Sequence, residues 1–150
     1  MTVAAILKQK GGEVVSVTPA ATLPEIAAII AARRIGAVIV LQGEGQLAGI
    51  VSERDVVKAI AAHGAAALGK TAADIMTANV ITATPKTTIN DAMAQMDAGY
   101  FRHLPVVDNG KLVGIISVKD VVHARIETQA LEVDSLTEFV HRGVLAGGLR

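Results

Sequence analysis

The chain contains one sequence unit twice, and this internal repeat constrains the fold more than any other feature. Thr18-Pro19 recurs as Thr84-Pro85, and further along each unit Asp55 recurs as Asp120. The spacing between the copies shortens by one residue at a turn, where a change in length is easily absorbed. Each half is too short to bury a comfortable core alone. We therefore expect the two copies to pack into one globule with a pseudo-twofold axis.

Each unit predicts the same order of elements, β-α-β-β-α, and hence an α+β fold. Apolar runs bounded by turn residues predict short strands, at 14–17, 37–41 and 47–51 and again at 80–83, 104–107 and 112–116. A capping box is predicted before the first helix of each unit: a threonine hydroxyl accepts a free amide, and an acidic side chain three residues later reaches back. The pairs are Thr22 with Glu25 and Thr88 with Asp91.

The C-terminal part departs from the repeat. Apolar residues recur there in steps of three and four, which predicts one long amphipathic helix with Val122, Ile126, Ala130, Val133, Leu136 and Val140 on its apolar side and Gly143, Gly147 and Gly148 at its end. This helix could pack back onto its own chain. We favour self-association into a homodimer, because a long helix leaving a small body has apolar surface to bury.

These patterns predict four segments along the chain. Repeat 1 with the N-terminal segment spans 1–64, a linker spans 65–72, repeat 2 spans 73–125, and the C-terminal helix and tail span 126–150.

Composition argues against several functions. The 14 basic and 14 acidic residues give a net charge of zero, and aromatic residues make up 2% of the chain. Such a chain is not expected to bind the phosphate backbone of a nucleic acid or to stack nucleic-acid bases on aromatic side chains. No apolar segment is long enough for a membrane span, and the N-terminus lacks the pattern of a signal peptide, so we expect a cytoplasmic protein.

Catalysis and metal binding are not expected either. Cysteine is absent, and the four histidines are scattered without the spacing of metal ligands. Ser52 and Ser117 have no obvious base nearby in the sequence, so we predict no enzyme and no catalytic cofactor.

Two related motifs carry the chemistry that remains, one at 49–55 and one at 114–120. Each is a strand followed by a serine at a helix N-cap, a basic residue, and an aspartate in the first helical turn. One interpretation is structural, since Ser-x-x-Asp is itself a capping box. The other is functional, because a helix N-terminus with a basic side chain favours phosphate, and a nearby carboxylate can accept the two hydroxyl hydrogens of a ribose.

With these motifs the sequence resembles tandem CBS-domain proteins (the cystathionine-β-synthase type), a pair of repeats also called a Bateman module. The resemblance covers roughly residues 1–125 and also rests on the segments 73–77 and 100–108. It implies a stand-alone regulatory module of bacterial type, without catalysis, that acts in trans as an energy or metabolite sensor. Its implied ligand is adenosine-containing (AMP, ADP, ATP, NAD or S-adenosylmethionine) and binds in the cleft between the repeats. The alternative is a protein-interaction module with vestigial clefts.

The resemblance also implies a role for individual residues. Asp55 and Asp120 would hold ribose hydroxyls, with Ser52 and Arg54, or Ser117 and Lys119, at the ribose–phosphate end. The Asp55 site would be completed by Thr77, Val80, Ile81, Arg102 and His103. The Asp120 site would be completed by Lys8 or Lys10 and by Val14, Val15, Ala37 and Val38. The valines and isoleucine would enclose the adenine.

The two implied sites are not equivalent. Arg102 and His103 stand where the first unit has Gly36 and Ala37, which gives the Asp55 site two extra phosphate donors. The structural alternatives are a solvated arginine and a partly buried, hydrogen-bonded histidine. In the first unit, the segment 8–12 replaces an Ile-Met-Thr sequence of the family. This departure leaves three outcomes open for the Asp120 site: weaker binding, a preference for more phosphates, or no ligand.

Overall fold

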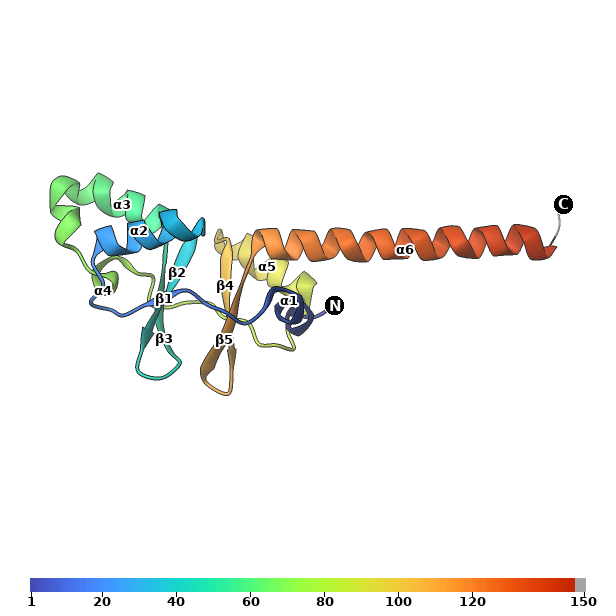
Figure 1. The fold of residues 1–150 in the computed structure, drawn as a ribbon, viewed down its shortest axis with the longest axis horizontal. Helices are drawn as coiled ribbons and strands as arrows, with labels where there is room; N and C mark the ends of the chain where they lie inside the picture. The colour runs from blue at the N-terminus through green and yellow to red at the C-terminus, as the bar shows by residue number, and fades with distance from the viewer. Residues whose placement is uncertain (148–150) are drawn as a thin grey trace.

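The structure, a computed structural model, describes residues 1–147 and has two halves of the same architecture (Figure 1). The first half contains β1 (Ser16–Val17), α2 (Leu23–Arg33), β2 (Ala37–Gln42), β3 (Gln46–Ser52) and α3 (Glu53–His63). The second half contains α5 (Ile89–Gly99), β4 (His103–Asp108), β5 (Lys111–Ser117) and α6 (Val118–Gly147). Three further helices precede or join the halves: α1 (Val3–Lys10), the 3₁₀ helix η1 (Gly64–Gly69) and α4 (Ala72–Ile75).

The strand registers show that the halves are copies of one unit. The antiparallel pairs β2–β3 and β4–β5 place Ala37 opposite Ser52 and His103 opposite Ser117. Both pairs also shift register at the same point of the repeat, at Val40 and at Val106. The two hairpins hang side by side beneath the helices (Figure 1). The predicted pseudo-twofold α+β architecture is therefore confirmed.

The first strand of each unit is shorter than predicted. β1 runs parallel to β2 through Ser16 and Val17 only. The strand predicted at 80–83 is wrong: within residues 1–147 it is reduced to a parallel bridge between Ala83 and Val106. The reason lies upstream, where Thr77 exchanges two backbone hydrogen bonds with Ile50 of β3. Thr77 is held on the first half, so only Ala83, the last residue of the predicted strand, reaches β4.

The predicted helix caps are present at α2 and α5. The Glu25 amide donates to the Thr22 hydroxyl, and the Thr22 amide donates to the Glu25 carboxylate, which completes the predicted box. At α5 the Asp91 amide donates to the Thr88 hydroxyl at 3.1 Å, which is one half of the predicted box. Both helices therefore begin where the threonines predict.

Each half completes its core with a helix from outside its own repeat unit. Val3 and Ile6 of α1 are buried with Leu104, Val106 and Ile116 of the second half. On the first half, Ala72 of α4 is buried, and Ile75 packs against the same core. The sequence grouped the N-terminal segment with repeat 1, whereas in space α1 packs on the second half. The domain boundaries along the chain stay a prediction.

The segment between the repeats is ordered. It forms η1, whose Ala67 is fully buried with Leu23 and Ala59. Burial of an apolar side chain holds this segment on α2 and α3, so it is part of the first half rather than a free tether.

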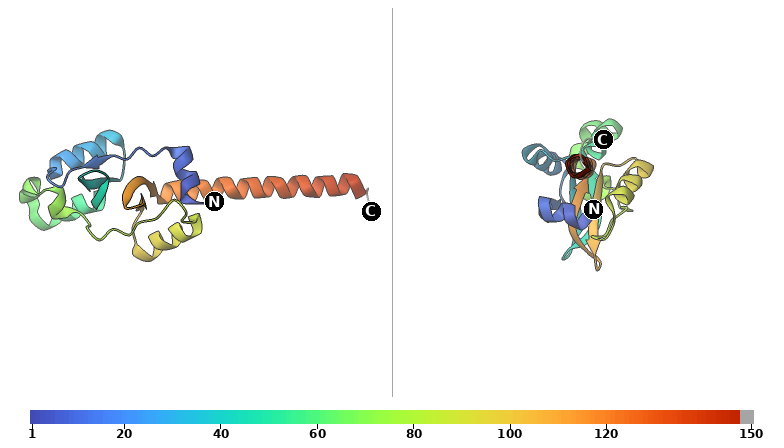
Figure 2. Two further views of the ribbon diagram at one scale, coloured as in Figure 1. Left: turned by 90° about the horizontal axis from the view of Figure 1, so that it is seen from below. Right: turned by 90° about the vertical axis from the view of Figure 1, so that its right-hand side faces the viewer.

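α6 is one continuous helix of 30 residues, about 45 Å long at 1.5 Å per residue. Val121 and Ala124 anchor its first turns in the second core, and the rest projects away from the body (Figure 2). The expectation that Gly143 ends the helix is wrong, since one glycine costs only about 1 kcal/mol in a helix interior. Gly147 is the last helical residue, and Gly148 lies outside the described residues.

The projecting part of α6 does not pack back on its own chain. Ile126, Val133, Leu136 and Val140 are each about 60% exposed, at 59%, 60%, 63% and 61%. This excludes the first interpretation of the helix. Among the described residues, no helix combines the length and apolar character that crossing a membrane requires.

Candidate functional site

The two Ser-x-x-Asp motifs form capping boxes of the same geometry. In the first, the Ser52 amide donates to Asp55 Oδ2 at 2.8 Å and the Asp55 amide donates to Ser52 Oγ at 3.2 Å. In the second, the Ser117 amide donates to Asp120 Oδ2 at 2.8 Å and the Asp120 amide donates to Ser117 Oγ at 3.2 Å. All four residues are half-buried. The boxes fix each carboxylate at a helix N-terminus, so the capping role is present whether or not a ligand binds.

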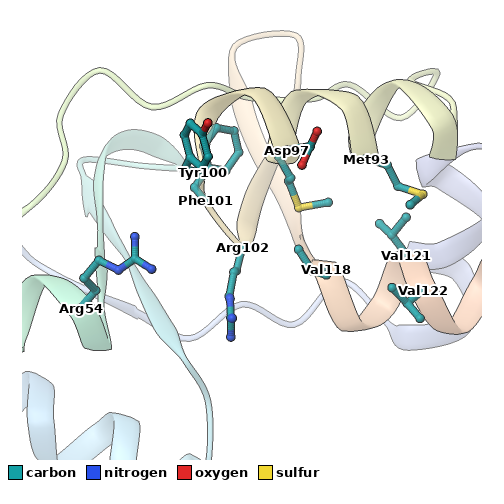
Figure 3. A pocket seen from close by; sticks show the side chains of 10 residues that line it. Arg54, Met93, Asp97, Tyr100, Phe101, Arg102, Val118, Val121 and Val122 are labelled. Atoms are coloured by element: carbon teal, nitrogen blue, oxygen red, sulfur yellow. The ribbon is translucent and has the colours of Figure 1, made fainter.

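Beside Asp55, the structure brings together two of the predicted phosphate donors from different repeats. Arg54 of α3 and Arg102, the residue before β4, line one pocket of about 400 Å³ (Figure 3). Asp97 and Tyr100 also line the pocket, and Tyr100 is 86% exposed. The remaining lining residues are apolar: Met93, Met96, Phe101, Val118, Val121 and Val122. Asp55 follows Arg54 on α3 but does not line this pocket.

The apolar residues that line this pocket were not predicted from the sequence. They come from α5, the start of α6 and the turn before β4, and their apolar spacing is also that of ordinary core positions. Tyr100 and Phe101 gave the only signal, as two of the chain's three aromatic residues.

The predicted partners of Asp55 at 77–81 lie next to its strand. The Thr77 amide donates to the Ile50 carbonyl at 2.9 Å, and the Ile50 amide donates to the Thr77 carbonyl at 3.1 Å. Thr77 is therefore held against β3 two residues before the Ser52 cap. Val80 is half-buried and Ile81 is 48% exposed, so both retain apolar surface outside the core.

Beside Asp120, the structure places Lys10 rather than Lys8. Lys10 Nζ donates to Asp120 Oδ2 at 2.7 Å and to the Ile115 carbonyl at 2.9 Å. Burial raises the pKa of Asp120, but the hydrogen bond and charge of Lys10, together with hydrogen bonds from Ser117, outweigh it and lower the pKa below its usual value. Lys119, predicted at the phosphate end, is exposed.

The remaining partners predicted for Asp120 are mostly core residues. Val38 is fully buried in the first core and Ala37 is 7% exposed, so only their backbone groups could face a ligand. The Val15 carbonyl accepts from the Ile39 amide at 3.1 Å, while Val14 is half-buried.

His103 lies between the two motifs. Burial is the largest effect on the pKa of His103 and lowers it; Lys10 and Arg102 lower it further, while Asp120 and Glu53 oppose the shift. The resemblance assigned His103 to the Asp55 site, whereas the charges that act on it here include Lys10 and Asp120. The predicted gathering of phosphate donors is therefore divided: Arg54 and Arg102 line one pocket, whereas His103, which pairs with Ser117 across β4 and β5, does not line it.

No three side chains of the histidine, cysteine, aspartate or glutamate type come together as a potential metal site within the part of the chain that the structure describes.

The family model for the CBS domain matches the chain twice, over residues 6–62 and 72–127. Together with the duplicated fold and the two Ser–Asp motifs, this shows that the chain belongs to the CBS-domain family and contains a tandem pair. Proteins with paired CBS domains are typically regulatory modules.

Solved structures share the fold over most of this chain. The CBS-domain containing protein ATU1752 from Agrobacterium tumefaciens is 44% identical, with a TM-score of 0.80 over 83% of this chain and 99% of that one. The CBS domain pair of protein MJ0100, solved with 5-methylthioadenosine and S-adenosyl-L-methionine, is 26% identical, with a TM-score of 0.76 over 85% and 98%. CBSX2, solved with AMP, is 25% identical, with a TM-score of 0.72 over 85% and 98%.

Proposed function

We propose that this protein is a non-catalytic regulatory module that binds an adenosine-containing ligand, with AMP the simplest candidate, in the cleft between its repeats. The observation that carries the proposal is the Asp55 carboxylate, fixed by the Ser52 box one residue after Arg54, which lines a pocket together with Arg102 of the other repeat. The adenosyl ligands of the MJ0100 and CBSX2 structures support the same ligand class.

The chemistry of this arrangement suits a nucleotide. An ionised carboxylate accepts hydrogen bonds from two adjacent ribose hydroxyls, as an acidic residue does in dinucleotide folds. Two guanidinium groups offer forked donors that match phosphate oxygens. Ile81 and Val80 supply apolar surface near Thr77 for the adenine ring. ADP, ATP, NAD and S-adenosylmethionine share the adenosine part, so the phosphate end decides among them.

The proposed output is a change in the orientation of the two repeats. Arg54 belongs to the first repeat and Arg102 precedes the first strand of the second, so a ligand that binds both bridges the halves. A ligand shifts such an equilibrium by the difference in its affinity for the two states. The module would then act in trans on a protein target.

A thermal-shift titration tests this function with AMP, ADP, ATP, NAD, NADH and S-adenosylmethionine. At least one ligand should raise the melting temperature of the wild type, since a ligand at about 100 times its Kd stabilises by about 2.7 kcal/mol. Asp55→Asn should lose the shift. No shift with any of these ligands at millimolar concentration would contradict the proposal.

A matched variant separates binding from capping. Asp74 caps α4 through Thr71 in the same way that Asp55 caps α3 through Ser52. Asp74→Asn should therefore weaken a comparable cap yet keep the ligand shift. A loss of the shift in both variants would indicate a general effect of destabilisation instead of a ligand contact.

A second candidate, a dimerising interaction module, is favoured by α6. Ile126, Val133 and Val140 recur every seven residues on its exposed part, with Leu136 between them. β-branched residues at one core position of the heptad, with leucine at the other, favour two parallel helices in a coiled coil. Here the other position holds Leu136, with Gln129 and Gly143 before and after it. We propose that α6 pairs with the same helix of a second copy, and the two functions are compatible in one protein.

A further inference from the structure

Each half packs against a helix that comes from outside its own repeat: α1 lies on the second half and α4 on the first. The two helices occupy equivalent positions. Leu7 of α1 covers Gly114 on β5, where a Cβ would meet its Cδ2 at 2.6 Å, and Met76 covers Gly49 on β3, where a Cβ would meet its Sδ at 2.7 Å. The residues before the helices match as well, since Thr2 bridges Thr88 and Thr71 bridges Thr22. α1 and α4 are therefore structural counterparts.

The two helices differ in length, and this difference breaks the symmetry at the ligand motifs. α4 ends at Ile75, and the chain continues extended so that the Thr77 amide reaches the Ile50 carbonyl. α1 continues to Lys10. At the counterpart of Ile50, the Ile115 carbonyl accepts from Lys10 Nζ at 2.9 Å. A backbone amide on one half is thus replaced by an ammonium group on the other.

The same ammonium group contacts Asp120 Oδ2 at 2.7 Å. Asp120 Oδ2 therefore accepts from the Ser117 amide and from a charged donor that comes from the N-terminal helix. At Asp55 the second donor to Oδ2 is the hydroxyl of Ser52 itself, at 3.0 Å. A hydroxyl rotates away at little cost, whereas Lys10 must leave both an ion pair and a carbonyl before a ribose can take its place.

We infer that Lys10 is an internal competitor for the ribose position of Asp120, so that AMP fills the Asp55 site while the Asp120 site stays closed. This inference rests on the proposed function and specifies how its two sites differ. Displacing Lys10 breaks hydrogen bonds of a charged group, which should weaken ribose binding at Asp120 about tenfold or more.

The experiment is calorimetric titration of AMP into the full-length protein. The wild type should bind one AMP per chain, and Asp55→Asn should remove it. Lys10→Met keeps the length and apolar stem of the side chain without its charge, and should bind two AMP per chain. The second event should vanish in Lys10→Met with Asp120→Asn. Lys86→Met removes an exposed charge elsewhere and should keep one AMP per chain.

The outcomes distinguish a failure of this inference from a failure of the proposed function. Two equal sites in the wild type, or one site in Lys10→Met with its fold intact, would overturn the closure of Asp120 and leave ligand binding in place. Absence of AMP binding in the wild type with binding restored in Lys10→Met would overturn the role of Asp55 and keep that of Lys10. No binding in any variant, with AMP, ATP or S-adenosylmethionine, would overturn both.

A second measurement needs no ligand. Because Lys10 lowers the pKa of Asp120, the carboxyl group of Asp120 should titrate at a higher pH in Lys10→Met than in the wild type or in Lys86→Met. The NMR chemical shift of its carboxyl carbon, followed against pH, measures this. An unchanged titration would show that the ion pair does not persist in solution, and would overturn the inference without bearing on AMP binding at Asp55.

Discussion

His103 lies directly against Gly36: a Cβ at Gly36 would be 2.9 Å from Cε1 and 3.0 Å from Nε2 of the imidazole ring. Gly36 comes just before β2 and His103 begins β4, so this contact joins the two halves at equivalent ends of their hairpins. The Gly36 carbonyl also accepts from the Glu53 amide, as the Arg102 carbonyl accepts from the Val118 amide. Each half thus has the same internal hydrogen bond at the place where Gly36 and His103 bring the two halves into contact.

The first prediction concerns this contact. Gly36→Ala should destabilise the protein by about 1–3 kcal/mol, the usual cost of inserting a methyl group into a closely packed place. Urea unfolding measures the change. In a His103→Ala background the same substitution should cost much less, because the imidazole is gone. Gly69→Ala is the control, since a Cβ there meets nothing within 4 Å. Equal costs in both backgrounds would refute the contact.

The second prediction is a pH dependence of stability due to His103. Burial lowers the pKa of His103 in the folded protein below its ordinary 6.5. The unfolded chain therefore binds the proton more readily, so the stability due to His103 is complete above about pH 6.5 and is lost as the pH falls through the folded pKa. Unfolding by urea between about pH 7.5 and about pH 5 should show this slope.

His103→Gln should flatten that slope, and His63→Gln, which changes an exposed histidine at the end of α3, should keep it. A slope of equal steepness in the wild type and in His103→Gln would show that other groups cause it. Lys10, Arg102, Asp120 and Glu53 are the charged groups that act on the pKa of His103.

Much of this fold was predictable because its signals are local or repeated. The capping threonine and serine residues set the starts of α2, α3 and α5, and the duplicated motifs placed Asp55 and Asp120 at helix N-termini. The strand expected at 80–83 failed because Thr77 is held by β3 of the other half. Nothing in the local sequence reports such a competition between distant segments.

The motifs of the candidate site were predictable from the sequence, but only some of the residues that lie next to them were. The choice of Lys10 over Lys8 depends on where α1 ends and on how it lies across β5, which the spacing of its residues does not determine. The position of His103 depends on the approach of Gly36 from the other repeat. Both are long-range contacts, and they also distinguish the two implied sites from one another.

The third prediction tests the packing of α1 on the second half. Ile6 is 5% exposed in the second core, so Ile6→Ala should cost about 2–5 kcal/mol through lost burial and the cavity left behind. Ile60→Ala makes the same change at a residue 48% exposed on α3 and should cost far less. Chemical denaturation compares the two. Equal, small losses would mean that α1 is not part of the second core.

The fourth prediction concerns pairing through α6. Val133→Glu combined with Val140→Glu should convert a dimer to a monomer, because each introduces a charge into the proposed seam. Light scattering on a sizing column measures the mass.

Leu131→Glu is the control: Leu131 is 67% exposed, but by heptad spacing it lies on the opposite side of the helix, so the dimer should persist. Truncation after Arg125 keeps Val121 and Ala124 in the core and should also give a monomer. A mass that none of these changes alters would exclude α6 as the pairing helix.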